Sequence, residues 1–296
     1  MNLKQFLARG WPTRLAFHIG KIIPPGMAYW LARRCARLAV RLKSDIYHTA
    51  RANLRHVTPD ASEAALDAAV ERLFEQALRG YYELFHNVGR GVVAAEDFAP
   101  PVYISPELRG YIDAALADGR GLFILGSHMS NFDLGGIALS QYIPVQVQVL
   151  SVAEPPPGFE FFNQLREKGD GIVTPVSPEV LRDAMRRLRE GGVVITGVDR
   201  PGDDGDEPVT FFGETAHLPT GYMRIPLRTD CLMMTVAFVY REGAYWIIGN
   251  PPLEVERTGD RHQDVIHNVQ RILAQIEDLI RVAPDQWMMF VPVWPA

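Results

Sequence analysis

The sequence has only two cysteines, Cys35 and Cys231, among its 296 residues. Two cysteines build no disulfide framework and lack the spacing of a zinc site, so we expect a reducing compartment. The first 30 residues have no compact apolar segment followed by a small-residue cleavage site, and we predict no signal peptide. The longest uncharged run, residues 134–153, is broken by glycine, glutamine and proline, and so predicts no transmembrane helix.

Several catalytic signatures are also missing. There is no G-x-S-x-G nucleophile elbow, no P-loop, no H-E-x-x-H zinc motif and no G-x-G-x-x-G dinucleotide motif. These absences disfavour a serine hydrolase, an NTPase and a zinc protease. The acids Asp203, Asp204, Asp206 and Glu207 do not follow the spacing of a calcium loop, so we interpret them as a solvated acidic loop and predict no metal site.

Acidic residues are absent from the first 44 positions, which carry nine Lys or Arg against a net charge of −5 for the whole chain. Within this segment, residues 28–42 predict a helix with Ala28, Leu31, Cys35, Leu38 and Leu42 on one stripe and arginines on the opposite side. Such a helix can lie on an anionic membrane surface. The alternative is an ordinary helix whose apolar stripe packs on the core. No nucleic-acid-binding module is recognisable, so nucleic acid is not an expected partner.

The order of predicted elements indicates an α/β fold. Residues 1–90 are predicted to be helical, with Ser62 as the N-cap of a long helix, and the stretch 98–106 to be a connection. Strands and helices then alternate, which predicts a mainly parallel sheet flanked by helices, with a helical N-terminal appendage. Strands are expected at 122–125, 145–149, 172–174 and 193–198, a hairpin at 231–249 through Glu242-Gly243, and helices at 106–117, 132–142, 158–168, 178–190 and 261–282. We expect an arm over residues 1–44 and a single domain over residues 45–296.

The candidate catalytic residues are His128 and Asp133, five apart on the turn between a buried strand and a helix. That turn lies at the carboxyl end of a strand, where open α/β sheets place their chemistry. A histidine there can act as a base, and a carboxylate one turn into the helix can orient it. In the alternative interpretation, His128 is a structural histidine of the core and Asp133 is only its hydrogen-bond partner.

Two further stretches carry candidate binding residues. Arg166 is placed on a helix, where it could hold a phosphate or carboxylate or simply be solvated. Asp199 and Arg200 follow a buried strand on the same sheet edge as His128 and can converge with it. Phe211-Phe212-Gly213 is expected either to line a pocket or to fasten a loop by packing.

Taken together, these pieces resemble the glycerolipid acyltransferase superfamily. The branch resembled contains the bacterial lipid A biosynthesis (lauroyl/myristoyl) acyltransferases and the phosphatidylinositol-mannoside acyltransferases. The matching residues run in order along nearly the whole chain: Asn53-Leu54, Gly126-Ser127-His128 with Asn131 and Asp133, Phe162-Asn163 with Arg166, Asp199, Val209–Glu214, Pro219-Thr220-Gly221, and Pro284 with Gln286-Trp287. The sequence departs from the lipid A enzymes in having Asp133 where Glu is usual, in its basic arm, and in a tail without an arginine-rich ending.

The resemblance implies direct acyl transfer from acyl-CoA or acyl-carrier protein to a hydroxyl of a glycolipid or phospholipid precursor, without a cofactor. His128 would be the general base, Asp133 would orient it, and backbone N–H groups at the following helix start would stabilise the oxyanion. It also implies a peripheral protein on the cytoplasmic face of the inner membrane, in contact with membrane lipids. The residues expected to bind substrate are Ser127, Asn131, Arg166, Asp199, Arg200, Phe212, Gly213 and Thr220.

Two competing functions remain open from the sequence. One is a metal-dependent phosphoesterase that uses His128, Asp133 and the acids between Asp199 and Glu207. The other is a non-catalytic lipid-binding protein on the same scaffold. Metal dependence would identify the first, and lipid binding that is unchanged by loss of His128 would identify the second.

Overall fold

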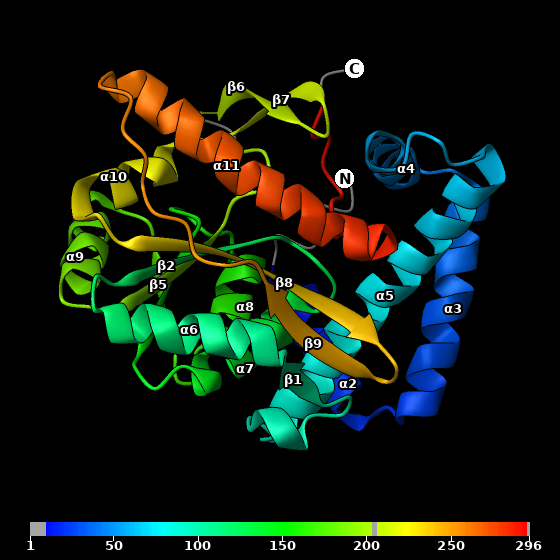
Figure 1. Cartoon of the computed structure of the whole chain (residues 1–296). Helices are drawn as coiled ribbons and strands as arrows, with labels where there is room; N and C mark the ends of the chain where they lie inside the picture. Colours follow the sequence, from blue (N-terminus) through cyan, green and yellow to red (C-terminus); the bar gives the residue numbers. More distant parts are fainter. Residues whose placement is uncertain (1–9, 203–205, 295–296) are drawn as a thin grey trace.

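The computed structural model describes residues 10–202 and 206–294. Its N-terminal part is a group of helices packed along the long helix α5 (Figure 1). They are α2 (Trp11–Ile22), α3 (Pro25–Leu42), α4 (Asp45–Val57) and α5 (Glu63–Gly89). Ser62 caps α5 as expected, because its hydroxyl accepts a hydrogen bond from the Ala65 N–H at 3.2 Å.

The centre of the molecule is a seven-stranded sheet in the order β1-β9-β8-β2-β5-β3-β4. All neighbouring strands pair in parallel except β8 and β9, which form an antiparallel hairpin. This confirms the predicted mainly parallel α/β fold with a helical N-terminal region. The strands are β1 (Val102–Ile104), β2 (Leu122–Gly126), β3 (Val147–Ser151), β4 (Ile172–Pro175), β5 (Val193–Gly197), β8 (Leu232–Arg241) and β9 (Ala244–Gly249).

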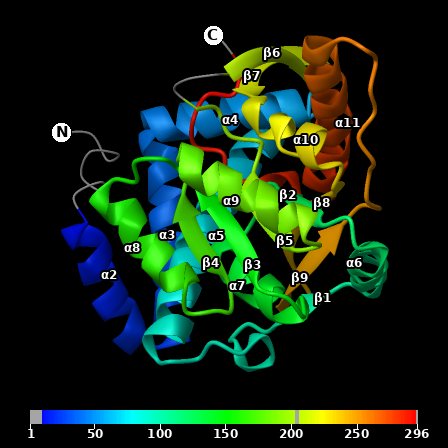
Figure 2. The same cartoon turned by 90° about the vertical axis from the view of Figure 1, so that its left-hand side faces the viewer.

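Helices cover both faces of the sheet, which is why the central strands are apolar throughout (Figures 1 and 2). Successive residues of β2 serve different cores: Leu122 and Ile124 face one, Phe123 and Leu125 the other. The covering helices are α6 (Pro106–Asp118), α7 (Phe132–Tyr142) and α8 (Pro157–Arg166), together with α9 (Pro178–Arg189) and α11 (Arg261–Val282). Short helical turns complete the chain: η1 (Ala95–Asp97), η2 (Gly221–Arg224), α10 (Pro226–Thr229) and η3 (Pro284–Gln286).

Two pieces of β-structure were not predicted. The stretch expected to be only a connection contains β1, which pairs with the edge strand β9. The stretch expected to be an irregular loop forms a separate hairpin of β6 (Asp206–Phe211) and β7 (Glu214–Pro219). Asp206 and Glu207 therefore lie in a strand rather than in an acidic loop, whereas Asp203 and Asp204 lie outside the described residues.

Helix α3 does not pack through the apolar stripe that an ordinary core helix would bury. In α3 the buried residues are Ala28, Ala32 and Ala36, because small side chains let the helix approach α5 closely. Leu38 and Leu42, on the predicted apolar stripe, are 56% and 68% exposed. The stripe is therefore largely open to solvent, with Ala28 as its one buried member.

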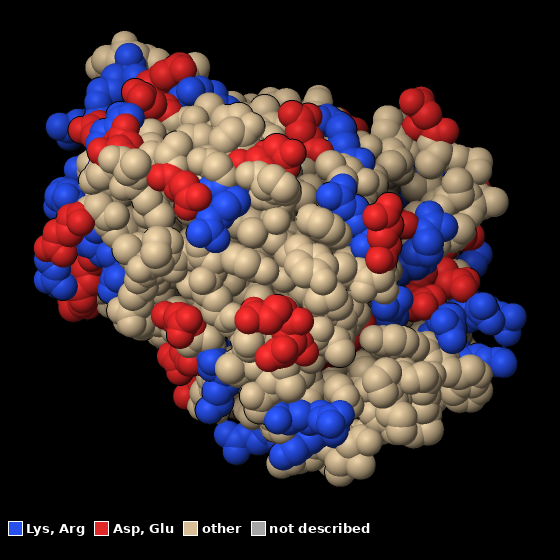
Figure 3. Space-filling model, turned by 60° about the horizontal axis from the view of Figure 1, so that its bottom comes forward, with Lys and Arg blue, Asp and Glu red and all other residues tan. Residues whose placement is uncertain are grey.

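Charged residues of both signs are interspersed on the face of the molecule shown in Figure 3, around a broad area without charged side chains. This face therefore has no large field of one sign of the kind that steers nucleic acid.

Candidate functional site

The paired strands β2 and β5 bring His128 and Asp199 together. Gly126 and Gly197 are register partners at the ends of these strands, and the two functional side chains each follow two residues later. Because parallel strands end at the same edge of the sheet, equal offsets beyond paired glycines place the two side chains side by side. The expectation that Asp199 converges with His128 is confirmed.

Asp199 uses both of its carboxylate oxygens to hold the His128 loop, residues 127–131 between β2 and α7. Its Oδ1 lies 2.6 Å from Nδ1 of the imidazole, and its Oδ2 accepts a hydrogen bond from the His128 backbone N–H at 2.9 Å. The indole N–H of Trp287 donates to the same Oδ2 at 2.7 Å. The carboxylate thus fixes both the ring and the backbone of the histidine.

The Asp199 side chain is completely buried, yet it is held in its charged form. Burial opposes ionisation, but the neighbouring imidazole and the hydrogen bonds from His128 and Trp287 outweigh it and lower the pKa of Asp199. A buried carboxylate of this kind stabilises a positive charge on the imidazole when the ring takes up a proton.

The imidazole itself remains accessible, because 22% of the His128 side chain is exposed. The Cε1 atom of the ring lies next to Gly197, where an added Cβ would come within 2.7 Å of it. The rings of His128 and Phe132 form a T-shaped pair at 5.1 Å between centroids. Among the described residues, no protein group is bonded to Nε2. This nitrogen is therefore available for a bond to a group from outside the described protein.

Asp133 does not occupy the position expected for it. Its carboxylate Oδ1 accepts from Nε of Arg166 at 2.6 Å, and the guanidinium also donates to Asn163 at 2.7 Å. The carboxylate that contacts the imidazole is that of Asp199. The expected contact between Asp133 and His128 is therefore wrong, and the structure instead has two separate pairs, His128 with Asp199 and Asp133 with Arg166. Arg166, expected to be open to a phosphate or carboxylate, is already paired with Asp133 from within the protein.

Ser127 and Asn131 flank His128 and are both buried. The Ser127 hydroxyl has no hydrogen-bond partner among the described residues. The Asn131 side chain caps α7 by accepting from the Leu134 N–H at 3.2 Å and donates to the Gly80 carbonyl at 3.0 Å. Asn131 therefore bonds to groups of the protein itself, and its expected role in substrate binding stays a prediction.

The remaining predicted binding residues lie in the part of the chain around the β6–β7 hairpin. Phe212 and Gly213 are its two-residue turn, with φ angles of 50° and 79°, and the Phe212 ring packs near Trp287 at 6.4 Å between centroids. Thr220 is buried and donates to Glu207 at 3.0 Å. Arg200 directly follows Asp199 in the sequence, and its guanidinium lies near Tyr81. Phe211 and Phe212 thus pack near Trp287, the residue whose indole N–H donates to Asp199.

The tail from residue 284 was expected to pack against the sheet, and Pro284, Gln286 and Trp287 belong to the resemblance; residues 286–288 also bond to the His128 loop and to Asp199. The Met288 N–H donates to the His128 carbonyl at 2.7 Å, and the Ser130 N–H donates to the Gln286 carbonyl at 2.6 Å. The role of Trp287 was missed because nothing local in the sequence connects an indole to a carboxylate 88 residues earlier.

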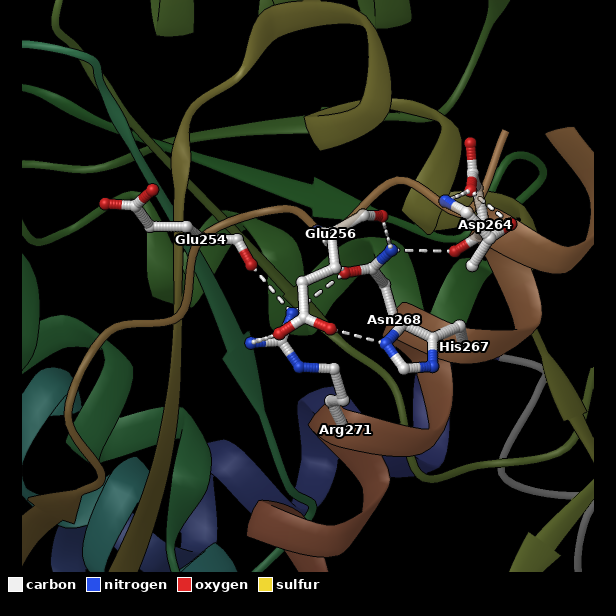
Figure 4. Close-up of polar contacts among 7 residues, drawn as sticks. Glu254, Glu256, Asp264, His267, Asn268 and Arg271 are labelled. Carbon is white, nitrogen blue, oxygen red and sulfur yellow. Dashed lines mark hydrogen bonds and ion pairs between the residues drawn. The ribbon is translucent and has the colours of Figure 1, made fainter. Parts of the chain in front are cut away.

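A second cluster of polar side chains lies apart from this site, between α11 and the segment before it (Figure 4). Nε2 of His267 lies 2.6 Å from Glu256, whose other oxygen contacts Arg271 at 2.9 Å. Asn268 donates to the backbone carbonyls of Glu256 and Asp264, both at 2.7 Å. This network fastens an irregular segment to a helix. Within residues 10–202 and 206–294, no group of three or more His, Cys, Asp or Glu side chains is arranged to hold a metal ion.

Comparison with known proteins agrees with this arrangement. The chain is 28% identical over 192 residues to a phosphatidylinositol mannoside acyltransferase of Mycobacterium tuberculosis, covering 63% of this chain and 58% of the relative. It is 25% identical over 189 residues to the protein of the same description from Mycolicibacterium smegmatis, covering 62% and 60%. The matches thus span about three fifths of these relatives' length. Residues 7–295 match the family described as bacterial lipid A biosynthesis acyltransferase, and the chain belongs to this family.

Proposed function

We propose that this chain transfers a fatty acyl group from an acyl thioester to a hydroxyl of a glycolipid or phospholipid precursor. The observation that carries the proposal is the His128–Asp199 pair, with Nδ1 held at 2.6 Å by a buried carboxylate and Nε2 left for substrate. The description of the mycobacterial relatives favours a mannosylated phosphatidylinositol as the class of acceptor to test first.

In the proposed reaction, Nε2 of His128 takes the proton of the acceptor hydroxyl as its oxygen attacks the thioester carbonyl. The C–O bond forms, the C–S bond breaks, and the imidazolium returns the proton to the departing thiolate. Asp199 stabilises the imidazolium and keeps the ring in one tautomer, a role that the sequence had assigned to Asp133. General-base catalysis of this kind contributes about 10²–10⁴-fold.

The negative charge that develops on the carbonyl oxygen needs a hydrogen-bond donor to stabilise it. Helix α7 begins at Phe132, four residues after His128, and its first turn offers backbone N–H groups and the positive end of a helix dipole. Asp133 and Arg166 lie in the same neighbourhood as a pair, so we propose that they shape the site and that Arg200 is the arginine more open to a phosphate.

For the acyl chain we propose a path along a row of aromatic rings near the site. Aromatic rings from three helices follow one another between the arm and Asp133: Phe17 contacts Phe161, and Phe85 and Phe162 stack near Tyr81. Tyr81 is half-exposed and lies within electrostatic reach of Asp133. Helix α2 packs against α8 (Figure 2). The row of rings therefore leads from the arm toward Asp133.

We also propose that the arm over residues 1–44 rests on an anionic membrane surface and that residues 45–296 form one domain. Large apolar side chains recur along one side of α2, at Leu15, Ile19 and Ile22, and all are exposed. Arg33, Arg34, Arg37 and Arg41 of α3 are exposed as well. Each cation near an anionic leaflet contributes about 1 kcal/mol of attraction. Among the described residues, no helix is long and apolar enough to cross a membrane.

Two experiments test the proposal. Purified wild type and His128→Ala are incubated with long-chain acyl-CoA or acyl-carrier protein and with mannosylated phosphatidylinositol or a bacterial lipid extract, with His267→Ala as the matched control. Wild type and the control should transfer the acyl group to a lipid, and His128→Ala should not. Metal-dependent phosphate release would instead support a phosphoesterase, and lipid binding without transfer would support the binding protein.

The second experiment concerns the arm. Leu38→Glu/Leu42→Glu should reduce co-sedimentation with anionic vesicles, whereas Val282→Glu, which changes an equally exposed residue of α11, should not. Equal binding of both variants to the vesicles would show that the arm does not rest on the membrane surface.

A further inference from the structure

Glu83 is a buried carboxylate that the proposed reaction does not use. It lies on α5 and its side chain is fully buried. A charged group in such a place is retained only when other groups compensate its charge, so its neighbours show what it holds.

The neighbours of Glu83 come from the arm, from α5 and from the β8–β9 hairpin. The Tyr245 hydroxyl donates to one carboxylate oxygen, and Arg79 lies 3.4 Å from the other. The Arg79 guanidinium is sandwiched between the rings of Tyr29 and Tyr240, at 4.4 and 4.7 Å from their centroids. Burial raises the pKa of Glu83, and the tyrosine and arginine oppose that rise. The carboxylate thus fixes the direction of the Tyr245 hydroxyl.

Asn131 bonds to the same part of α5, because its side-chain amide donates to the Gly80 carbonyl at 3.0 Å, three residues before Glu83. With the Leu134 N–H as its other partner, the Asn131 side chain has both a donor and its acceptor oxygen engaged, so it has one orientation. It therefore fixes the start of α7 relative to α5, which Glu83 ties to β9 through the Tyr245 hydroxyl.

Asn131 lies within the loop that carries the candidate base. It is three residues after His128 and two before Asp133, next to Ser130, which has a φ of 49°. A non-glycine residue in the left-handed region is strained and persists only where its surroundings hold it. The Gln286 carbonyl holds this loop from one side by accepting from the Ser130 N–H. The Asn131 amide holds it from the other.

We infer that Glu83 and Tyr245 are positioning residues that act through Asn131 to hold the His128 loop in its reactive geometry. This inference rests on the proposed acyl transfer. Neither residue needs to touch substrate. Because a misplacement of about 1 Å costs about 10²-fold in rate, loss of the Tyr245 hydroxyl should lower kcat by about 10- to 100-fold and leave KM for the donor nearly unchanged.

The test compares Tyr245→Phe with Tyr142→Phe in the full chain. Tyr142 lies on α7 and its hydroxyl donates to the Val102 carbonyl at 2.8 Å, so its loss also removes one hydrogen bond but leaves Asn131 untouched. Steady-state kinetics are measured well below both melting temperatures. We expect the kcat loss in Tyr245→Phe alone. Equal kcat in the two variants would overturn the inference.

A double-mutant cycle separates positioning from a general loss of stability. In an Asn131→Ala background, Tyr245→Phe and Glu83→Gln should cause no further loss of kcat, because their effect passes through the missing amide. Independent, multiplying losses would show that they act elsewhere.

A spectroscopic measurement keeps the inference separate from the proposed function. The imidazole NMR signals of His128, assigned with His128→Ala, should shift in Tyr245→Phe and stay in place in Tyr142→Phe. If wild type transfers no acyl group from either donor, the proposed function fails while this measurement still decides the positioning. Unshifted signals in both variants would contradict it.

Discussion

Two histidines of this molecule contact a carboxylate oxygen at the same distance, 2.6 Å, in opposite surroundings. His128 meets Asp199, whose side chain is fully buried, whereas His267 meets Glu256, whose side chain is 54% exposed. In both cases the pKa of the carboxylate is lowered. The bond length therefore does not distinguish the candidate catalytic pair from a surface pair.

What differs is how each pair is held. Asp199 also binds the His128 backbone and the Trp287 indole, so its position is set by three donors from two distant segments. Glu256 shares its charge with Arg271 at the surface, where water and salt screen the interaction (Figure 4). Burial and extra donors turn a contact into a fixed geometry, and the predictions below test that difference.

The largest expected difference is in catalysis. Asp199→Asn keeps the volume of the side chain but presents an amide to Nδ1, which favours the wrong tautomer of the imidazole. We expect acyl transfer to fall by about 10³-fold or more, as for the equivalent change in Ser-His-Asp triads. Glu256→Gln should retain wild-type rates. Initial rates at saturating donor measure both, and an active Asp199→Asn would remove the aspartate from the mechanism.

The next effect concerns the space beside the imidazole. In Gly197→Ala the new Cβ would lie 2.7 Å from Cε1 of His128, so the ring must move. We expect a loss of about 10²-fold in kcat. Gly136→Ala, in α7, meets nothing within 4 Å and should keep full activity with a gain of about 0.5–1 kcal/mol in the free energy of unfolding. Matching rates in the two variants would show that the ring tolerates displacement.

A smaller loss is expected for Trp287→Phe. It removes one of the three donors to Asp199 and keeps an aromatic ring in the core. Since a hydrogen bond to a charged group is worth about 1.5 kcal/mol or more, we expect roughly a tenfold loss in rate. Within residues 10–202 and 206–294, only His267 and Arg271 donate to the Glu256 carboxylate, so no single substitution around Glu256 should reproduce this effect. Activity assays with circular dichroism as the folding control decide the point.

The smallest effect is on the pH dependence of stability. A carboxylate whose folded pKa is lowered stabilises the fold above its unfolded pKa, about 3.9 for Asp, and loses that contribution as the pH falls through the folded value. The excess stability of wild type over Asp199→Asn should therefore shrink as the pH falls below about 4. Urea unfolding between pH 2 and about pH 7 measures this trend.

The corresponding trend for Glu256 should respond to salt. Its lowered pKa is caused first by the hydrogen bond to His267, at an exposed position. Any difference between wild type and Glu256→Gln should vanish at about 1 M salt, where the Debye length is about 3 Å. A difference at Asp199 that also vanished would mean that its burial is not what protects it.

Much of the fold could be predicted because its determinants are local. The apolar runs of the central strands, the Ser62 cap and the Glu242-Gly243 turn each depend on residues close in sequence. The edge strand β1 was missed because three residues carry little pattern of their own. The β6–β7 hairpin was missed because its turn residues, Phe212 and Gly213, do not form one of the familiar turn dipeptides.

The candidate site was predicted in part, for the same reason. His128 follows a buried strand and stands out locally, and Asp133 was chosen as its partner because it is near in sequence. The actual partner is 71 residues away, and only the strand register that pairs Gly126 with Gly197 brings it close. A single sequence does not reveal which strands are neighbours, so it did not decide between two carboxylates.

The dependence of the His128 loop on Trp287 also has a consequence in time. Trp287 is added to the growing chain 88 residues after Asp199, which takes about 4–18 s at the usual 5–20 residues per second. During that interval a nascent chain already contains the histidine and the aspartate but lacks the indole and the Met288 N–H that hold them. The geometry around His128 is therefore completed only after synthesis has passed Met288.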